Sequence, residues 1–267
     1  MRALSLALPL AVALAACDSS DDPGIPYDLS QPDTVLVLDE ELREISGLTW
    51  LVGGRLVAVQ DEDGELFELD PETGAVFRQR RFFNDGDYEG IEQANGVMWI
   101  VESDGDLYRY SGSGEAERIE TGLERANEVE GLAYDASRRH LLLACKEEPG
   151  AGLAGVRAVY AYDLDAEDLL PSPVYTLDRE ALDVGDDLFK PSGLAVHPES
   201  REIYVLSSAR EALAVLTPEG ALRTSVSLPS GLFPDPEGIA FAPDGTLYVS
   251  NEGADGLATL LRFSPGE

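Results

Sequence analysis

The sequence contains few of the residues from which common catalytic and metal centres are built. It has two cysteines and two histidines among 267 residues. A zinc site of four thiolates is therefore excluded, and one of two thiolates and two imidazoles would need every cysteine and histidine in the chain. A small scaffold held by several disulfides is excluded for the same reason. The motifs of nucleophile-elbow hydrolases, P-loop proteins and zinc proteases are also missing.

Basic residues are scarce as well. The chain has 19 Lys+Arg against 51 Asp+Glu, which gives a formal net charge of -32. Such a chain repels nucleic acid and anionic lipid, so a nucleic-acid partner is excluded. Hydrophobic residues make up 44% of the chain, which is ordinary for a globular protein and argues against disorder. No stretch after residue 30 keeps apolar residues at helical spacing for three turns, so a helical fold is disfavoured.

The first residues are typical of a targeting segment. Arg2 precedes an apolar run over residues 3–16, and Cys17 follows small residues and precedes the polar run 18–22. This pattern resembles a bacterial lipoprotein signal, in which Cys17 becomes the lipidated first residue. We therefore expect a signal peptide at 1–16, an acidic tether at 17–33, and a lipid-anchored protein of the bacterial envelope, facing the periplasm or the cell surface. The alternative is a plain secretory signal cleaved after an alanine.

The remainder of the chain repeats one unit five times. Each unit begins with Glu-Gly or Ser-Gly and a Leu or Ile, continues to a turn, and then enters a second apolar run. The anchor glycines at 47, 90, 131, 193 and 238 are spaced by 43, 41, 62 and 45 residues. Units of about 40–50 residues with short strands are the size of four-stranded propeller blades. The long spacing contains two expected loops, at 148–155 and 183–187.

These repeats predict an all-β fold, a five-bladed β-propeller with four-stranded antiparallel blades, over residues 34–267. The run 34–38 precedes the first anchor and has no unit of its own. We expect it to pair as the outer strand of the last blade and to close the ring, which removes an exposed sheet edge. A double-sheet sandwich is possible from the strand count alone, but it does not explain glycines at blade spacing.

The five anchor segments resemble the SdiA-regulated propeller family, which is distantly related to NHL-repeat proteins. The resemblance rests on an ordered series of short motifs across 34–263: Ser46-Gly47-Leu48, Glu89-Gly90-Ile91, Glu130-Gly131-Leu132, Ser192-Gly193-Leu194 and Glu237-Gly238-Ile239. It implies a five-bladed propeller with a bound calcium ion at a shared site. It implies no established catalytic activity.

The residue before each anchor glycine is acidic or carries a hydroxyl. Fivefold symmetry directs Glu89, Glu130 and Glu237, with Ser46 and Ser192, toward one axis. Carboxylates a few Å apart repel by roughly 4 kcal/mol per pair at an effective dielectric constant near 20. Either the pKa values rise or a cation lies between the groups, and Ca²⁺ prefers such oxygen ligands. The alternative is that each glutamate bonds backbone N–H groups of the next blade.

A second polar ring follows the second strand of the units. The candidates for lining the channel there are Glu102, Lys146, Glu147, Asn251 and Glu252. They form either a ligand-binding mouth or an ion-paired, solvated rim.

The function that we expect is that of a membrane-anchored, calcium-binding propeller. It would act as a non-enzymatic binding or scaffold module for an unknown protein or small molecule. The alternative is a calcium-dependent hydrolase of the lactonase or phytase type, in which a cation polarises a carbonyl or activates water. Lactonases of this kind add further ligands, for which Asn127, Asn251 and Asp235 are available. A phytase would need basic residues for phosphate, which this acidic chain lacks.

Overall fold

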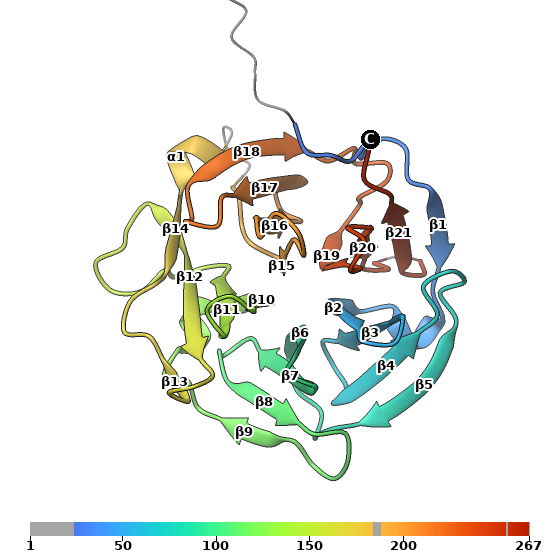
Figure 1. Ribbon diagram of the computed structural model, residues 1–267, viewed down its shortest axis with the longest axis horizontal. Coiled ribbons are helices and arrows are strands. Elements are labelled where there is room, and N and C mark those ends of the chain that lie inside the picture. Colours follow the sequence, from blue (N-terminus) through green and yellow to red (C-terminus); the bar gives the residue numbers. More distant parts are fainter. Residues whose placement is uncertain (1–23, 184–187, 255, 267) are drawn as a thin grey trace, which may run out of the picture.

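The computed structural model describes residues 24–183, 188–254 and 256–266, and these residues form a five-bladed β-propeller. Five antiparallel sheets surround a central axis (Figure 1), so the predicted fold is confirmed. No helix in the described part of the chain is long and apolar enough to cross a membrane. The short helical turns are η1 (Glu40–Leu42), η2 (Arg125–Asn127) and α1 (Arg179–Leu182).

The blades follow the order of the repeats, and the first strand named in blades 1 to 5 is the innermost. Blade 1 contains β2 (Ile45–Leu51), β3 (Arg55–Gln60), β4 (Glu65–Leu69) and β5 (Val76–Arg81). Blade 2 contains β6 (Tyr88–Ala94), β7 (Val97–Glu102), β8 (Leu107–Tyr110) and β9 (Glu117–Ile119). Blade 3 contains β10 (Val129–Asp135), β11 (His140–Cys145), β12 (Val156–Asp163), β13 (Asp168–Leu169) and β14 (Tyr175–Asp178). Blade 4 contains β15 (Gly193–Val196), β16 (Ile203–Ser207), β17 (Ala212–Leu216) and β18 (Leu222–Ser227). Blade 5 contains β19 (Pro236–Phe241), β20 (Leu247–Asn251), β21 (Thr259–Phe263) and β1 (Thr34–Val37).

The ring closes through β1, as the sequence predicts. This strand pairs antiparallel with β21, with Thr34 opposite Arg262 and Val37 opposite Thr259. The last blade is therefore assembled from both ends of the chain, and the first and fifth repeats cannot separate without breaking this pairing. Closure also covers the edge of β21, which would otherwise present unpaired backbone groups.

The segment before β1 differs from the predicted solvated tether. Tyr27 and Leu29 are 6% and 7% exposed and pack against the cluster between blades 4 and 5. The Tyr27 hydroxyl also donates a 2.6 Å hydrogen bond to the carbonyl of Gly245. The apolar ring and the leucine explain this docking, because their burial removes nonpolar surface from water. The expected signal peptide and Cys17 lie outside the described residues.

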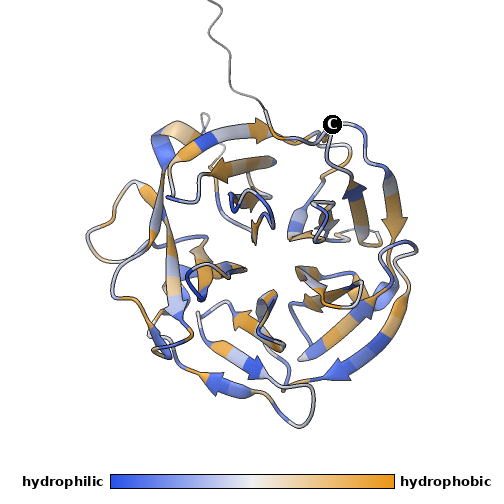
Figure 2. Ribbon diagram, viewed as in Figure 1, coloured by the Kyte–Doolittle hydropathy of each residue, from blue (hydrophilic) through white to orange (hydrophobic). Residues whose placement is uncertain are grey.

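The hydrophobic core consists of five clusters, one between each pair of neighbouring blades. In β11, Leu142 packs toward blade 4 whereas Leu143 packs toward blade 2, which is the two-residue alternation of a strand. Because both faces of a middle strand are buried, β11 is apolar at every position after His140 rather than alternating. Figure 2 shows the reverse for outer strands such as β5, where hydrophilic residues predominate and the burial pattern is mostly exposed.

The anchor glycines allow the innermost strands to approach one another around the axis. A Cβ at Gly90 would lie 2.8 Å from the Leu132 Cβ of the next blade, and one at Gly131 would lie 2.8 Å from the Leu194 Cβ. The same relation holds around the ring: Gly47 meets Gly90 and Ile91, Gly193 meets the Glu237 carbonyl and Ile239, and Gly238 meets Leu48. The repeated glycine is therefore a packing requirement, since any side chain there would push two blades apart.

Replacing an anchor glycine by alanine tests this requirement. Gly131→Ala places a methyl group 2.8 Å from Leu194 and 3.0 Å from Ala144, and we expect it to lower the free energy of unfolding by about 1–3 kcal/mol. Chemical denaturation measures the change. Gly231→Ala is the matched control, because nothing lies within 4 Å of its Cβ. Equal stability of the two variants would contradict a packing role for the anchor glycine.

Candidate functional site: the acidic end of the channel

The two predicted polar rings lie at the same end of the propeller. Each innermost strand begins where the second strand of its blade ends, as the pairs Tyr88–Glu102, Val129–Cys145 and Pro236–Asn251 demonstrate. Residues just before an anchor glycine therefore lie beside residues that follow the second strand. We call this end of the channel the acidic end.

The axis at this end holds a very small cavity. Its lining includes Ser46 and all three predicted glutamates, Glu89, Glu130 and Glu237, and its volume is about 10 Å³. That volume accommodates about one water molecule or one small ion. The fold therefore brings the carboxylates of three blades to one cavity, as the symmetry argument predicts.

The glutamates at the cavity resist ionisation. Burial, followed by the charges of Glu130, Asp87 and Glu237, raises the pKa of Glu89 to about 10. Burial and the charges of Glu130 and Asp235 also raise the pKa of Glu237 well above its ordinary value. Without a compensating cation, Glu89 therefore holds its proton near neutral pH, and the pKa of Glu237 is shifted in the same direction.

One ammonium group already lies at this end. Lys146 Nζ donates a 2.6 Å hydrogen bond to Glu130 Oε1. Burial lowers the pKa of Lys146, but the charges of Glu130, Glu237 and Glu89 raise it above its ordinary value. Burial likewise raises the pKa of Glu130 to about 7 although Lys146 opposes the shift. Glu130 is 7% exposed, and its Oε2 has no hydrogen-bond partner within the described part of the chain.

The two anchor serines connect blades rather than face the cavity with a free hydroxyl. Ser46 Oγ donates to the Tyr88 carbonyl at 2.6 Å, and Ser192 Oγ donates to the Pro236 carbonyl at 2.8 Å. In both cases the acceptor belongs to the next blade. At these two positions the side chain before the anchor glycine thus makes a hydrogen bond to the backbone of the next blade.

The tightest group of carboxylates at this end contains Asp235, Glu237 and Glu252. One oxygen of each lies within 4.8 Å of the others, and no other group of this kind occurs among residues 24–183, 188–254 and 256–266. Burial, a side-chain hydrogen bond with Glu44 and the charge of Asp235 raise the pKa of Glu252 to about 8. Symmetry between the repeats does not predict this group, because Asp235 and Glu252 do not precede an anchor glycine. The strand pairing in blade 5 places them beside Glu237.

The other members of the second ring have partners within the protein. Glu102 accepts a hydrogen bond from the Tyr108 hydroxyl. Asn251 is 1% exposed, and its Nδ2 donates to the Leu232 carbonyl at 3.0 Å and to Thr259 Oγ1 at 2.9 Å. The Oδ1 of Asn251 accepts no hydrogen bond from the described residues.

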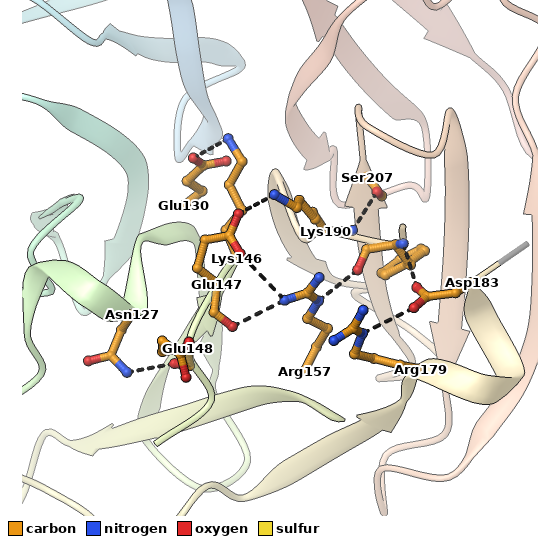
Figure 3. A network of polar contacts seen from close by, with 11 residues as sticks. Asn127, Glu130, Lys146, Glu147, Glu148, Arg157, Arg179, Asp183, Lys190 and Ser207 are labelled. Atoms are coloured by element: carbon orange, nitrogen blue, oxygen red, sulfur yellow. Dashed lines mark hydrogen bonds and ion pairs between the residues drawn. The ribbon is translucent and has the colours of Figure 1, made fainter. Parts of the chain in front are cut away.

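Glu147 belongs to an ion-pair network that connects blades 3 and 4 (Figure 3). Its carboxylate pairs with Lys190, and its backbone carbonyl accepts a 3.1 Å hydrogen bond from Arg157. Arg157 is 3% exposed and also donates to the Phe189 carbonyl at 2.8 Å. These contacts bring the two lysines, Lys146 and Lys190, to the side of the acidic end that blades 3 and 4 form. Among residues 24–183, 188–254 and 256–266, no ion pair to Asp235 or Glu252 is found.

The fold and the site define a five-bladed propeller with an acidic channel end. The sequence matches the family described as SdiA-regulated over residues 32–254, so the chain belongs to the SdiA-regulated family. No curated protein matches the sequence.

Solved structures support the fold alone, because their sequences are distant. A glutaminyl cyclase from Myxococcus xanthus superposes with a TM-score of 0.61 at 15% identity, covering 88% of this chain and 95% of that one. A luciferin-regenerating enzyme gives 0.55 at 16% identity, covering 84% and 80%. The PQQ-bound aldose sugar dehydrogenase from Streptomyces coelicolor gives 0.53 at 14%, covering 88% and 99%.

The raised pKa values predict that the metal-free protein loses stability as the pH rises. Glu89 and Glu252 have pKa values above the ordinary 4.5 in the folded state. Their contribution to stability is therefore lost as the pH rises from about 5 to about 8 for Glu252 and to about 10 for Glu89. We expect the melting temperature in chelator to fall over this range, and the fall to lessen in Glu89→Gln/Glu252→Gln. The exposed pair Glu115→Gln/Glu120→Gln is the control. A melting temperature that rises with pH would contradict the assignment.

Proposed function

We propose that this protein is a calcium-binding propeller of the bacterial envelope that acts as a binding or scaffold module. The observation that carries the proposal is the group Asp235, Glu237 and Glu252, whose oxygens lie within 4.8 Å of one another. Ca²⁺ takes oxygen ligands at about 2.3–2.6 Å, so ligands on opposite sides of the ion are about 4.6–5.2 Å apart. The three carboxylates therefore suit this ion without a large rearrangement.

The number of carboxyl groups near Asp235, Glu237 and Glu252 favours a divalent cation over a monovalent one. Glu237 joins the group to the axial cavity, where Glu89 and Glu130 add two further carboxyl groups. Lys146 supplies a single positive charge there and bonds Glu130. A hard divalent cation would favour ionised forms of Glu237 and Glu252, whose pKa values are raised in its absence.

The charge of the acidic end favours binding over phosphate hydrolysis. A phytase needs basic side chains for phosphate, whereas the group consists of three carboxylates and the adjoining axial cavity takes about one water molecule. The partner of the propeller is a protein or a small molecule, and the acidic surface favours one with positive charge.

Calcium titration of the purified protein tests the cation site. We expect about one site by calorimetry, and a rise in the free energy of unfolding of about 2.7 kcal/mol at 100 times the dissociation constant. Asp235→Asn/Glu237→Gln/Glu252→Gln should remove both effects. The matched control Glu40→Gln/Glu115→Gln/Glu120→Gln changes the charge equally at exposed positions and should retain them.

Other variants locate the cation. Loss of binding in Glu89→Gln/Glu130→Gln, with full binding in Asp235→Asn/Glu252→Gln, would move the ion deeper along the axis. An absence of heat and of any melting shift in millimolar calcium would overturn the calcium proposal.

Envelope anchoring through Cys17 has its own test. In a bacterial host, we expect the wild-type chain to incorporate labelled fatty acid and to sediment with membranes. Cys17→Ser should abolish labelling and release the protein into the soluble fraction, because an acyl anchor adds about 0.8 kcal/mol per buried methylene. Cys145→Ser is the matched control, since this thiol is buried in blade 3. Membrane association of Cys17→Ser without label would contradict the lipid anchor.

A further inference from the structure

The other end of the channel has a different chemistry. At the C-terminal ends of the innermost strands lies a hollow of about 220 Å³ that all five blades line. Its wall includes three aromatic rings, two prolines and one carboxylate: Trp50, Tyr134, Phe241, Pro198, Pro243 and Glu92. We call it the aromatic hollow. Its three aromatic residues, Trp50, Tyr134 and Phe241, share one position in their repeats, three residues after the anchor glycine.

Glu92 is the one charged residue among the described residues that line the hollow. Its Oε1 accepts hydrogen bonds from Thr49 Oγ1 at 2.6 Å and from the Gln93 N–H at 2.7 Å, and its Oε2 accepts from the Tyr134 N–H at 3.3 Å. No ion pair to Glu92 is found within the described ranges. The carboxylate therefore has three neutral donors and no counter-charge of its own.

The aromatic walls are held in place by a second layer of rings. Trp50 stacks on Tyr248 with ring centroids 5.7 Å apart. Phe241 meets His197 and Tyr204 edge-on, each at 4.9 Å. A ligand would therefore meet rings that are already fixed, and little conformational entropy would be lost on binding.

We propose that the aromatic hollow binds a small organic cation with a quaternary ammonium head. Aromatic faces attract such a cation, and the ionised form of Glu92 provides the opposite charge. Burial raises the pKa of Glu92 to about 7, and a bound cation favours the ionised form. A carboxylate offers about four lone-pair positions, of which three are used, so a head that needs no hydrogen-bond acceptor fits better than a primary ammonium. The volume is below the roughly 300–1,000 Å³ of sites for drug-sized ligands, which indicates a head group rather than a large molecule. This site lies beyond the proposed calcium function and does not depend on it.

The probes are tetramethylammonium chloride and its neutral analogue neopentyl alcohol, titrated into the purified protein at constant ionic strength. Calorimetry measures affinity, and tryptophan fluorescence locates the ligand, because the other tryptophan, Trp99, is 5% exposed. We expect the cation to bind about tenfold more tightly than the alcohol, which is within the range of cation–π recognition at a desolvated site.

Two variants separate recognition from structure. Trp50→Leu and Glu92→Gln should each weaken tetramethylammonium binding about three- to thirtyfold and leave the affinity for the alcohol within about twofold. If Glu92 only joined blades, Glu92→Gln would lower the affinities for the cation and for the alcohol together, or would change neither affinity. Phe77→Leu is the matched control, because this aromatic residue is 59% exposed on outer strand β5.

Three results would overturn the proposal. They are equal binding of the cation and the alcohol, cation binding that survives both Trp50→Leu and Glu92→Gln, and no cation binding at about ten millimolar. Binding of n-butylammonium as tight as that of tetramethylammonium would overturn the assignment to a quaternary head.

Discussion

The close approach of the five innermost strands is the constraint on which the rest of this structure depends. Each anchor glycine touches the innermost strand of the next blade, and the relation continues around the ring until Gly238 meets Leu48. The glycines set the distance between blades, and the five apolar clusters fill the wedges that this distance leaves. The pairing of β1 with β21 then holds the ring shut.

The same constraint creates the electrostatic problem at the acidic end. A residue that precedes an anchor glycine cannot avoid the axis, so Glu89, Glu130 and Glu237 share one small cavity. The protein reduces their repulsion in two visible ways. Lys146 neutralises Glu130, and the raised pKa of Glu89 keeps that carboxyl group protonated. A divalent cation at Asp235, Glu237 and Glu252 would be a third way, and it would exchange bound protons for a bound metal.

The two ends of the channel differ because different residues stand at the two ends of the innermost strands and in the loops that follow them. At one end, carboxylates and two lysines surround the axis. At the other end, Trp50, Tyr134 and Phe241 surround a single carboxylate, Glu92. As proposed, one scaffold would hold a hard metal ion at the acidic end and a soft organic cation in the aromatic hollow. The net charge of -32 makes both ends attractive to positive ligands.

The sequence by itself determined the number of blades, their order and the closing strand. These properties are local or periodic: the glycine spacing counts the blades, and the run 34–38 without its own repeat identifies β1.

Tertiary structure alone decided how the acidic residues group. Symmetry predicted Glu89, Glu130 and Glu237, but Asp235 and Glu252 approach Glu237 through strand register, and Lys146 reaches Glu130 from a second strand. It also decided that Ser46 and Ser192 bond the next blade, that Tyr27 docks onto the ring, and that Glu92 lies among aromatic rings. Each of these outcomes depends on side-chain direction and on contacts between residues distant in sequence, which a linear pattern does not record.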